Sequence, residues 1–406
     1  MNFSYFLAKR ITLSGQRTFS KLIVRVTIGA IVLAVAAMIL SVAILRGFKG
    51  EIVATQRGFF GDIVLSKQLL NDSYESDPIS LSASKLKGYQ SHPAVASVAP
   101  MATKAGIITV NQEVEGVLLK GIDSSYNQSY FQSALIAGDT LNYADPDQVN
   151  GQILISKIIA NRLSLSVGDD FIMYFVQEPI RKRKFKIQGI YSTGSEEMDK
   201  LYVIGSLDLI RRLNGMGQQD VGAYELRLKD FSKLAPLTAE LADTLPLGMV
   251  ISNIKDLFPD IFQWLDLLDM NAKIIFVLMA IVAIINMISA LLITILERTN
   301  MIGILKALGL SNQAVRKVFL FNALYLIGLG LLIGNSLGLG LCLFQQYTHF
   351  FQLDEASYYM SYVPIDLQAT DLLYINIGVV IISLVALLFP SMLITKISPI
   401  KAISFK

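Results

Sequence analysis

The sequence contains very few of the residues that build disulfides and metal sites. Among its 406 residues there is one cysteine, Cys342, and there are two histidines, His92 and His349. A single cysteine excludes an intrachain disulfide and a cysteine metal cluster, and two histidines argue strongly against a zinc site. The phosphate-binding pattern G-x-x-x-x-G-K-[ST] is also missing, so we expect no ATP to bind this chain through such a loop.

The sequence is also poor in charged residues. They make up 17% of the chain and hydrophobic residues 53%, against about 25% and 45–50% in ordinary globular proteins. This balance excludes a disordered chain, a small disulfide-rich module and an ordinary soluble enzyme. The acid pairs Glu196–Glu197 and Asp169–Asp170 are interpreted as solvated turn residues rather than acid–base dyads. We therefore expect no catalytic residues, no metal, no cofactor in this chain and no nucleic-acid partner.

Four long stretches lack Asp, Glu, Lys and Arg altogether: 26–45, 274–296, 318–344 and 372–395. At about 1.5 Å rise per residue, the shortest of them covers the roughly 30 Å hydrocarbon core of a bilayer. The first stretch is too long, and starts too far into the chain, to be a signal peptide. The sequence predicts an α-helical membrane protein with four transmembrane helices, which implies membrane lipid as its surroundings.

The positive charges flank these stretches unevenly. Basic residues gather before the first stretch, between the second and third, and after the fourth: Lys9, Arg10, Arg17, Lys21, Arg25, Arg298, Lys306, Arg316, Lys317, Lys396, Lys401 and Lys406. By the positive-inside rule both chain termini are cytoplasmic. The predicted divisions are a cytoplasmic interfacial helix 1–25, transmembrane helix 26–45, external domain 46–273, transmembrane helix 274–296, cytoplasmic loop 297–317, transmembrane helix 318–344, external loop 345–371, transmembrane helix 372–395 and cytoplasmic tail 396–406.

The large segment 46–273 mixes two periodicities. Alternating or β-branched runs predict strands at 62–67, 105–110, 116–122, 152–156, 170–176, 185–191, 201–205, 224–228 and 249–254. Helical patterns lie at 80–89, 156–165, 206–214 and 232–245. We expect a large α+β domain with two subdomains. Both of its edges look helical, and a short flexible joint is the alternative there.

The loop between the second and third spans is unusually apolar for a segment in water. Its residues Met301–Leu308 form a short apolar helix, which calls for a partner because exposed apolar patches mark interaction sites. Gly309 is placed to end that helix in the left-handed conformation, and Ser311 to cap the next one. A re-entrant turn packed on its own bundle is the alternative.

The third span carries glycines at four-residue spacing: Gly330, Gly334 and Gly338. Small residues at this spacing let helix backbones approach closely in a membrane. Asn286 and Ser289 in the second span, with Asn322 and Asn335 in the third, are expected to form hydrogen bonds across helices.

Several motifs together resemble the LolC/LolE family of lipoprotein-releasing permeases, within the group that includes MacB and FtsX. The N-terminal FLAKR, 6–10, is similar to F-[LI]-A-x-R, and GVLLKGID, 116–123, to G-x-x-x-x-G-[IV]-[DE]. ILISKIIANRLSLSVGD, 153–169, resembles the family's strand–helix–V-G-D segment. The most specific stretch is 283–311, which resembles an Asn-containing span followed by E-[RK]-x-x-[ED]-I-G-I-L-[RK]-A-[LM]-G-A-S. The resemblance covers nearly the whole chain and implies a MacB-like periplasmic core.

The resemblance also implies partners. The loop helix would dock onto a separate LolD-like ATPase that binds ATP and Mg²⁺, through the residues Glu297, Arg298, Met301, Ile302, Gly303, Ile304, Leu305, Lys306, Leu308 and Gly309. A second permease copy or a paralogue would complete a cavity, lined by the first and second spans, for a lipoprotein. A periplasmic LolA-like chaperone would receive the lipoprotein at the inner membrane of a Gram-negative bacterium.

Two positions depart from the family pattern. Met301 follows Asn300 where the family often places an acid, so the docking surface carries less charge. The tip of the predicted hairpin at 177–184 is shorter than the chaperone-recruiting insertion of LolC. Its candidate chaperone contacts are Pro179, Arg181, Lys182, Arg183 and Lys184, with a solvated turn as the alternative. A MacB-like efflux permease and an FtsX-like regulator of a cell-wall hydrolase are the alternative functions.

Overall fold

The computed structural model describes residues 18–68, 75–354, 358, 360–392 and 394, and it divides the chain into two compact units. The membrane unit consists of 1–50, 264–351 and 363–406, and the sheet unit consists of 51–263 and 352–362. Most of the predicted interfacial helix 1–25 and the tail 396–406 lie outside the described residues. Each unit is described by itself below.

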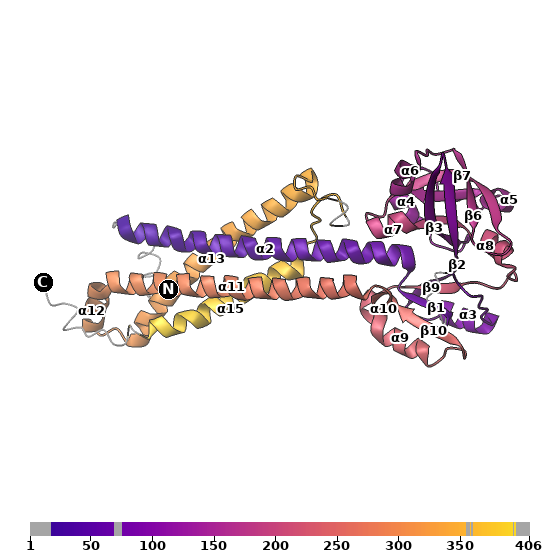
Figure 1. The fold of residues 1–406 in the computed structure, drawn as a ribbon. Helices are drawn as coiled ribbons and strands as arrows, with labels where there is room; N and C mark the ends of the chain where they lie inside the picture. Colours follow the sequence, from indigo (N-terminus) through magenta and orange to yellow (C-terminus); the bar gives the residue numbers. More distant parts are fainter. Residues whose placement is uncertain (1–17, 69–74, 355–357, 359, 393, 395–406) are drawn as a thin grey trace. The chain divides into compact units, whose positions relative to one another are not determined.

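Four long helices build the membrane unit: α2 (Thr18–Phe60), α11 (Pro259–Glu297), α13 (Asn312–Thr348) and α15 (Ala369–Ser391) (Figure 1). All four are long and apolar enough to cross a membrane, so the predicted number of transmembrane helices is confirmed. Helices α2, α11 and α13 extend past both ends of their predicted spans, because helix continues past the charge-free run. Helix α15 starts before its predicted span and ends at Ser391, before the predicted end at 395. Helix α2 continues unbroken past residue 50, and α11 begins before residue 264, so both unit boundaries lie within a helix. The alternative of a short flexible joint at these boundaries is therefore wrong.

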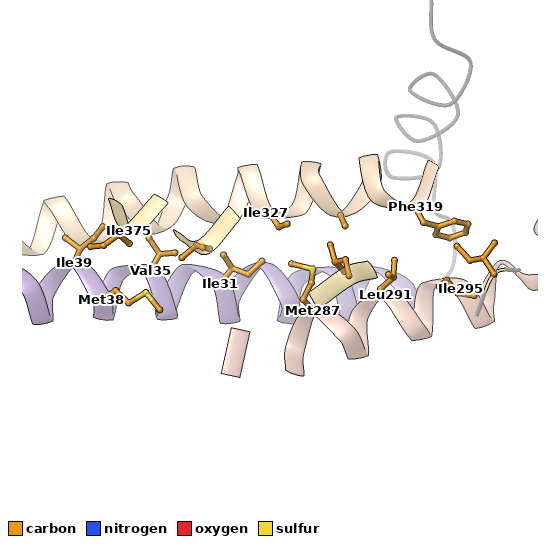
Figure 2. Close-up of a cluster of buried hydrophobic side chains, with 14 of the residues drawn as sticks. Ile31, Val35, Met38, Ile39, Met287, Leu291, Ile295, Phe319, Ile327 and Ile375 are labelled. Atoms are coloured by element: carbon orange, nitrogen blue, oxygen red, sulfur yellow. The ribbon is translucent and has the colours of Figure 1, made fainter. Parts of the chain in front are cut away.

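An apolar cluster between these helices forms the core of the membrane unit. Figure 2 shows Ile31, Val35 and Ile39 of α2 among its members. These three side chains lie one turn apart and face the glycines of α13. A Cβ added at Gly330 would lie 2.6 Å from Ile31 Cγ2, and one at Gly334 would lie 2.9 Å from Val35 Cβ. The backbones of α2 and α13 therefore approach closely because the side chains between them are missing.

The sheet unit is built on ten strands in one connected sheet. They are β1 (Ile63–Lys67), β2 (Val95–Val110), β3 (Glu113–Ile122), β4 (Leu135–Gly138), β5 (Gln152–Ser156), β6 (Asp170–Phe175), β7 (Arg181–Tyr191), β8 (Tyr202–Ser206), β9 (Ala223–Leu228) and β10 (Met249–Asn253). The helices are α3 (Ala83–Gln90), α4 (Ser129–Ala134), α5 (Pro146–Val149), α6 (Lys157–Leu163), α7 (Glu196–Leu201), α8 (Leu207–Asn214), α9 (Leu234–Ala242) and α10 (Ile254–Leu257). The predicted α+β class is confirmed.

The strand order divides the sheet into two groups that share β2. Strands β2, β3, β8, β5, β7 and β6 pair in turn and close on β2 again, while β10, β1 and β9 follow one another onto the first half of β2. β2 is 16 residues long, which is enough to take part in both groups. The two subdomains expected from the sequence are therefore joined through a shared strand rather than folded as separate sheets.

Candidate functional site

The short helix α12 (Thr299–Ala307) occupies the loop between the second and third spans. It begins two residues after α11 ends and is followed by Gly309, whose φ of +90° is in the region that favours glycine. Ser311 then accepts a hydrogen bond from the backbone N–H of Ala314, 3.3 Å away, and starts α13. These local signals fold the loop into two helices with a sharp turn between them.

One side of α12 faces the membrane unit and the other faces out. Ile302 is fully buried in the apolar cluster, and Gly303 beside it is buried as well. Ile304 is 51% exposed and Leu308 is 77% exposed. Residues four apart lie on the same face of a helix, so these two apolar side chains form one outward patch. We call Asn300, Ile304, Ala307 and Leu308, all exposed, the coupling surface.

The other predicted coupling residues have different surroundings. Glu297 ends α11 and Arg298 precedes α12, and both are half-buried, as are Met301 and Leu305. The Lys306 Nζ donates a hydrogen bond to the backbone oxygen of Ile394, 2.6 Å away, and burial lowers the pKa of this amine. Ile302, Gly303 and Lys306 thus hold α12 against its own unit and are less available to a partner than the sequence pattern suggested.

The polar pair across the third and fourth spans involves a residue that we did not anticipate. The side-chain amides of Asn335 and Asn376 exchange hydrogen bonds, at 2.7 Å and 3.1 Å, between α13 and α15. Asn286 in α11 is half-buried, and among the described residues its side chain has no hydrogen-bond partner.

The predicted turn at 177–184 is shorter than the sequence indicated. β7 starts at Arg181, so Arg181, Lys182, Arg183 and Lys184 lie in a strand, and the tip is the five-residue segment 176–180 with Pro179 in it. Phe175 pairs with Arg181, and Asp170 pairs with Lys186. The sequence predicts a turn at this basic run because a row of charges is rare in a strand interior. The prediction is wrong for these four residues, since three of their side chains are exposed to solvent in β7.

The outward face of this hairpin combines apolar and basic side chains. Val176 and Ile180 at the tip are 62% and 73% exposed. Tyr174 lies directly opposite Lys182 in the register, and Ile172 lies opposite Lys184. The Lys184 Nζ lies 2.7 Å from an Asp170 oxygen. The face therefore offers an exposed apolar tip followed by a short row of cations.

A buried polar network at the end of α2 was not found from the sequence. The Lys120 side chain in β3 is fully buried, with its Nζ 2.7 Å from Glu225 Oε1 of β9 and also donating to the Phe59 backbone oxygen. The Tyr126 hydroxyl donates to the other Glu225 oxygen at 2.8 Å. Burial lowers the pKa of Lys120, opposed by Glu225 beside it, and burial raises the pKa of Tyr126.

A second set of contacts holds the same helix end. Arg57 forms an ion pair with the buried Asp62, and its own backbone oxygen accepts a hydrogen bond from Arg227 of β9. The last carbonyls of a helix lack partners within the helix and attract positive charge. Arg227 and Lys120 supply it, so the C-terminal end of α2 is anchored to two strands of the sheet unit.

Two family models match the chain. The MacB-like periplasmic core domain matches residues 26–244, which is more than half of the chain, and the FtsX-like permease C-terminal domain matches residues 273–399. The first model covers nearly all strands of the sheet unit, and the second covers the last three long helices.

Relatives match over nearly the full length. The lipoprotein-releasing system transmembrane protein LolC of Neisseria meningitidis is 23% identical, over 96% of this chain and 95% of its own. The corresponding LolE protein of Haemophilus influenzae is 22% identical over the whole of both chains. The periplasmic region of MacB from Actinobacillus actinomycetemcomitans, 18% identical, covers 50% of this chain and 94% of its own with a TM-score of 0.35. The chain belongs to the family of FtsX-like permeases with a MacB-like periplasmic core domain, in its LolC/LolE branch.

Proposed function

We propose that this chain is the permease subunit of an ABC transporter that extracts lipoproteins from the outer leaflet of the inner membrane. The observation that carries the proposal is that similarity to LolC and LolE extends through both units, not only through the spans. Moving an acyl chain from lipid into water costs about 0.8 kcal/mol per CH₂ group. Extraction therefore needs an energy source on one side of the membrane and an apolar receiver on the other.

The energy source in this proposal is a separate, LolD-like ATPase that binds ATP and Mg²⁺ and docks on the coupling surface. Ile304 and Leu308 are exposed there although they are apolar, and a protein partner would remove them from water. The basic residues beside α12, with the positive-inside rule, support a cytoplasmic position for this surface and for both chain termini. The sheet unit would then lie in the periplasm.

The receiver in this proposal is a LolA-like periplasmic chaperone that binds the β6–β7 hairpin. An acidic surface with an apolar centre would complement Val176 and Ile180 at the tip and the exposed cations Lys182 and Lys184. Opposite charges across such an interface act mainly on the association rate and weaken with salt. A second copy of the chain, or a paralogue, would complete the cavity that its first and second spans line.

Reconstitution tests the proposal directly. Proteoliposomes would contain the full-length chain, its ATPase and a fluorescent triacylated lipoprotein, with the soluble chaperone outside. We expect the lipoprotein to appear on the chaperone only when ATP is present, and a non-hydrolysable nucleotide to abolish transfer. Steady ATP hydrolysis without any transfer to a competent chaperone would contradict the proposal and favour a MacB-like or FtsX-like role.

A matched pair of variants tests the hairpin. Lys182→Glu with Lys184→Glu reverses the exposed row and should slow transfer most at low salt, whereas Lys157→Glu changes an exposed lysine at the start of α6 and should not. Equal rates of lipoprotein transfer by both variants at low salt would show that the hairpin is not part of the chaperone interface.

A further inference from the structure

The membrane unit contains a cavity of about 360 Å³ between α2, α11 and α15. Met38 and Val42 of α2, Phe276 and Ala280 of α11, and Ile375 and Val379 of α15 are among its lining residues. Apart from the residues at its two ends, Asp371 and Ser383, its walls are almost entirely apolar. It lies within a single chain and is lined by the first, second and fourth spans.

The cavity is long. Asp371 and Ser383 both line it, and they are separated by twelve residues of helix α15. At 1.5 Å per residue this is about 18 Å, more than half of the roughly 30 Å hydrocarbon core. Small residues keep it open: Ala280 and Ala283 line one side, and a Cβ added to Gly378 on the other side would meet no atom within 4 Å. An apolar cavity that follows this length of α15 suits a single extended hydrocarbon chain.

An ion pair stands at one end of the cavity. Arg46 of α2 pairs with Asp371 of α15, whose side chain is only 12% exposed. Asp371 also accepts a hydrogen bond from the backbone N–H of Gln368, 3.2 Å away, and Tyr374, one turn further on, lines the cavity beside it. The end of the cavity is therefore polar but close to neutral overall.

This neutrality discriminates between lipid head groups. A phosphate at this end would gain attraction from Arg46 but would meet the carboxylate of Asp371, and like charges at close range repel. An uncharged ester or amide carbonyl accepts hydrogen bonds from Arg46 or Tyr374 without that repulsion. The acyl groups of both lipids are joined through esters or amides, but in a phospholipid a phosphate lies next to these carbonyls, and in a triacylated lipoprotein it does not.

We propose that this cavity holds one acyl chain of the lipoprotein and that the Arg46–Asp371 pair disfavours phospholipid there. The proposal rests on the proposed function. An acyl chain in the cavity would restore the close packing that is usual in protein interiors. It would also form dispersion contacts with the cavity walls that an empty cavity lacks. The acyl chain reaches it from the bilayer, in which apolar groups are already dissolved.

Photo-crosslinking tests the site without any ATPase cycle. The full-length chain, in complex with its ATPase, is incubated in nanodiscs with a triacylated lipopeptide that carries a diazirine midway along one acyl chain. We expect crosslinks on α15 and α11, for instance at Ile375 or Phe276. Gly378→Leu and Ala280→Leu should reduce them by at least about tenfold, since pocket contacts of this size change binding by 10- to 200-fold.

Gly340→Leu is the matched control, because a Cβ there also meets no atom within 4 Å but Gly340 lies on α13, away from the cavity. It should leave crosslinking unchanged, and all three variants should copurify with the ATPase. Crosslinks that persist in Gly378→Leu and Ala280→Leu, or that map to α13, would overturn the proposal.

The two proposals fail in different ways. Transfer of lipoprotein by the wild-type chain with no crosslink in this cavity would overturn the acyl site alone. Specific crosslinks without any ATP-driven transfer would uphold the acyl site and contradict the transport function.

Competition tests the ion pair. Phosphatidylglycerol in excess should compete poorly with the lipopeptide in the wild-type chain and at least about tenfold better in Asp371→Asn, which keeps the shape and removes the repelling charge. The control is Asp269→Asn. It breaks a different ion pair of α2, in which Lys49 Nζ lies 2.6 Å from an oxygen of Asp269 in α11, and neither residue lines the cavity. Equal competition in wild type and Asp371→Asn would refute the role of the pair.

Discussion

The two units bury their polar groups in different ways. In the sheet unit a full charge pair, Lys120 and Glu225, is enclosed together with the Tyr126 hydroxyl and a helix carbonyl. In the membrane unit the polar contact within the charge-free spans is neutral, an exchange between Asn335 of α13 and Asn376 of α15. The charged groups of this unit that form contacts lie outside those spans, among them Arg46, Arg316 and Asp371. Lipid offers no water to a chain before it packs, so an ionised pair is costly there. The sheet unit uses its buried charges to hold the end of α2.

The largest effect is expected at the buried charge pair. Lys120→Met leaves the Glu225 carboxylate buried without its cation, which costs about 3–5 kcal/mol of unfolding free energy. Proteolysis of the full-length chain in detergent, at rising urea, should show the sheet unit cleaved at much lower urea than in wild type.

Two controls sharpen this prediction. Lys186→Met removes an exposed lysine of β7 and should change the midpoint little. The double variant Lys120→Met with Glu225→Leu should recover part of the loss, because it removes the unpaired charge. A stable Lys120→Met single variant would show that the pair does not support this unit.

The next effect is expected in the membrane unit, where it depends on space rather than charge. Gly334→Leu places atoms where Val35 and the Val32 carbonyl already lie, 2.9 Å and 3.1 Å from the added Cβ. Overpacking of this kind costs about 1–3 kcal/mol. Thermal unfolding in detergent measures it, with Gly328→Leu as the control because a Cβ there meets nothing within 4 Å. Equal melting of the two variants would refute close α2–α13 packing.

The smallest effect is expected at the neutral pair. Asn335→Ala and Asn376→Ala should each cost little, and the coupling between them in a double-mutant cycle should average about 0.6 kcal/mol, as for other hydrogen bonds within membranes. A coupling as large as that of the buried charge pair would erase the contrast between the units.

Local patterns predicted much of both units. Alternation found strands such as β6, in which Phe171, Met173 and Phe175 are buried and Ile172 and Tyr174 are not. The four stretches without charged residues predicted the four long helices. The four-residue strand β4 was missed because its residues are mostly exposed and show no alternation.

Contacts between distant parts of the chain could not be predicted from the sequence. Lys120 and Glu225 are 105 residues apart, and Arg46 and Asp371 are 325 residues apart. Lys120 gave a hint, since it lies in the apolar second half of β3, which suggests a buried partner. Glu225 gave none, because Arg227 lies two residues further along β9. The sequence alone does not say which partner, because that depends on strand order. The exposed side of α12 could not be predicted either, because it depends on the burial of Ile302 in the apolar cluster.

The subunit composition of the complex purified from its native membrane tests the central claim most directly. We predict that the full-length chain copurifies with an ATP-hydrolysing subunit, and that Ile304→Asp and Leu308→Asp lose this subunit while their melting temperatures stay near wild type, because both side chains are exposed. Ile302→Asp, which buries a charge in the core, should instead fail to fold. Purification of the wild-type chain without any ATPase, or full retention of the ATPase by both exposed-site variants, would contradict the account.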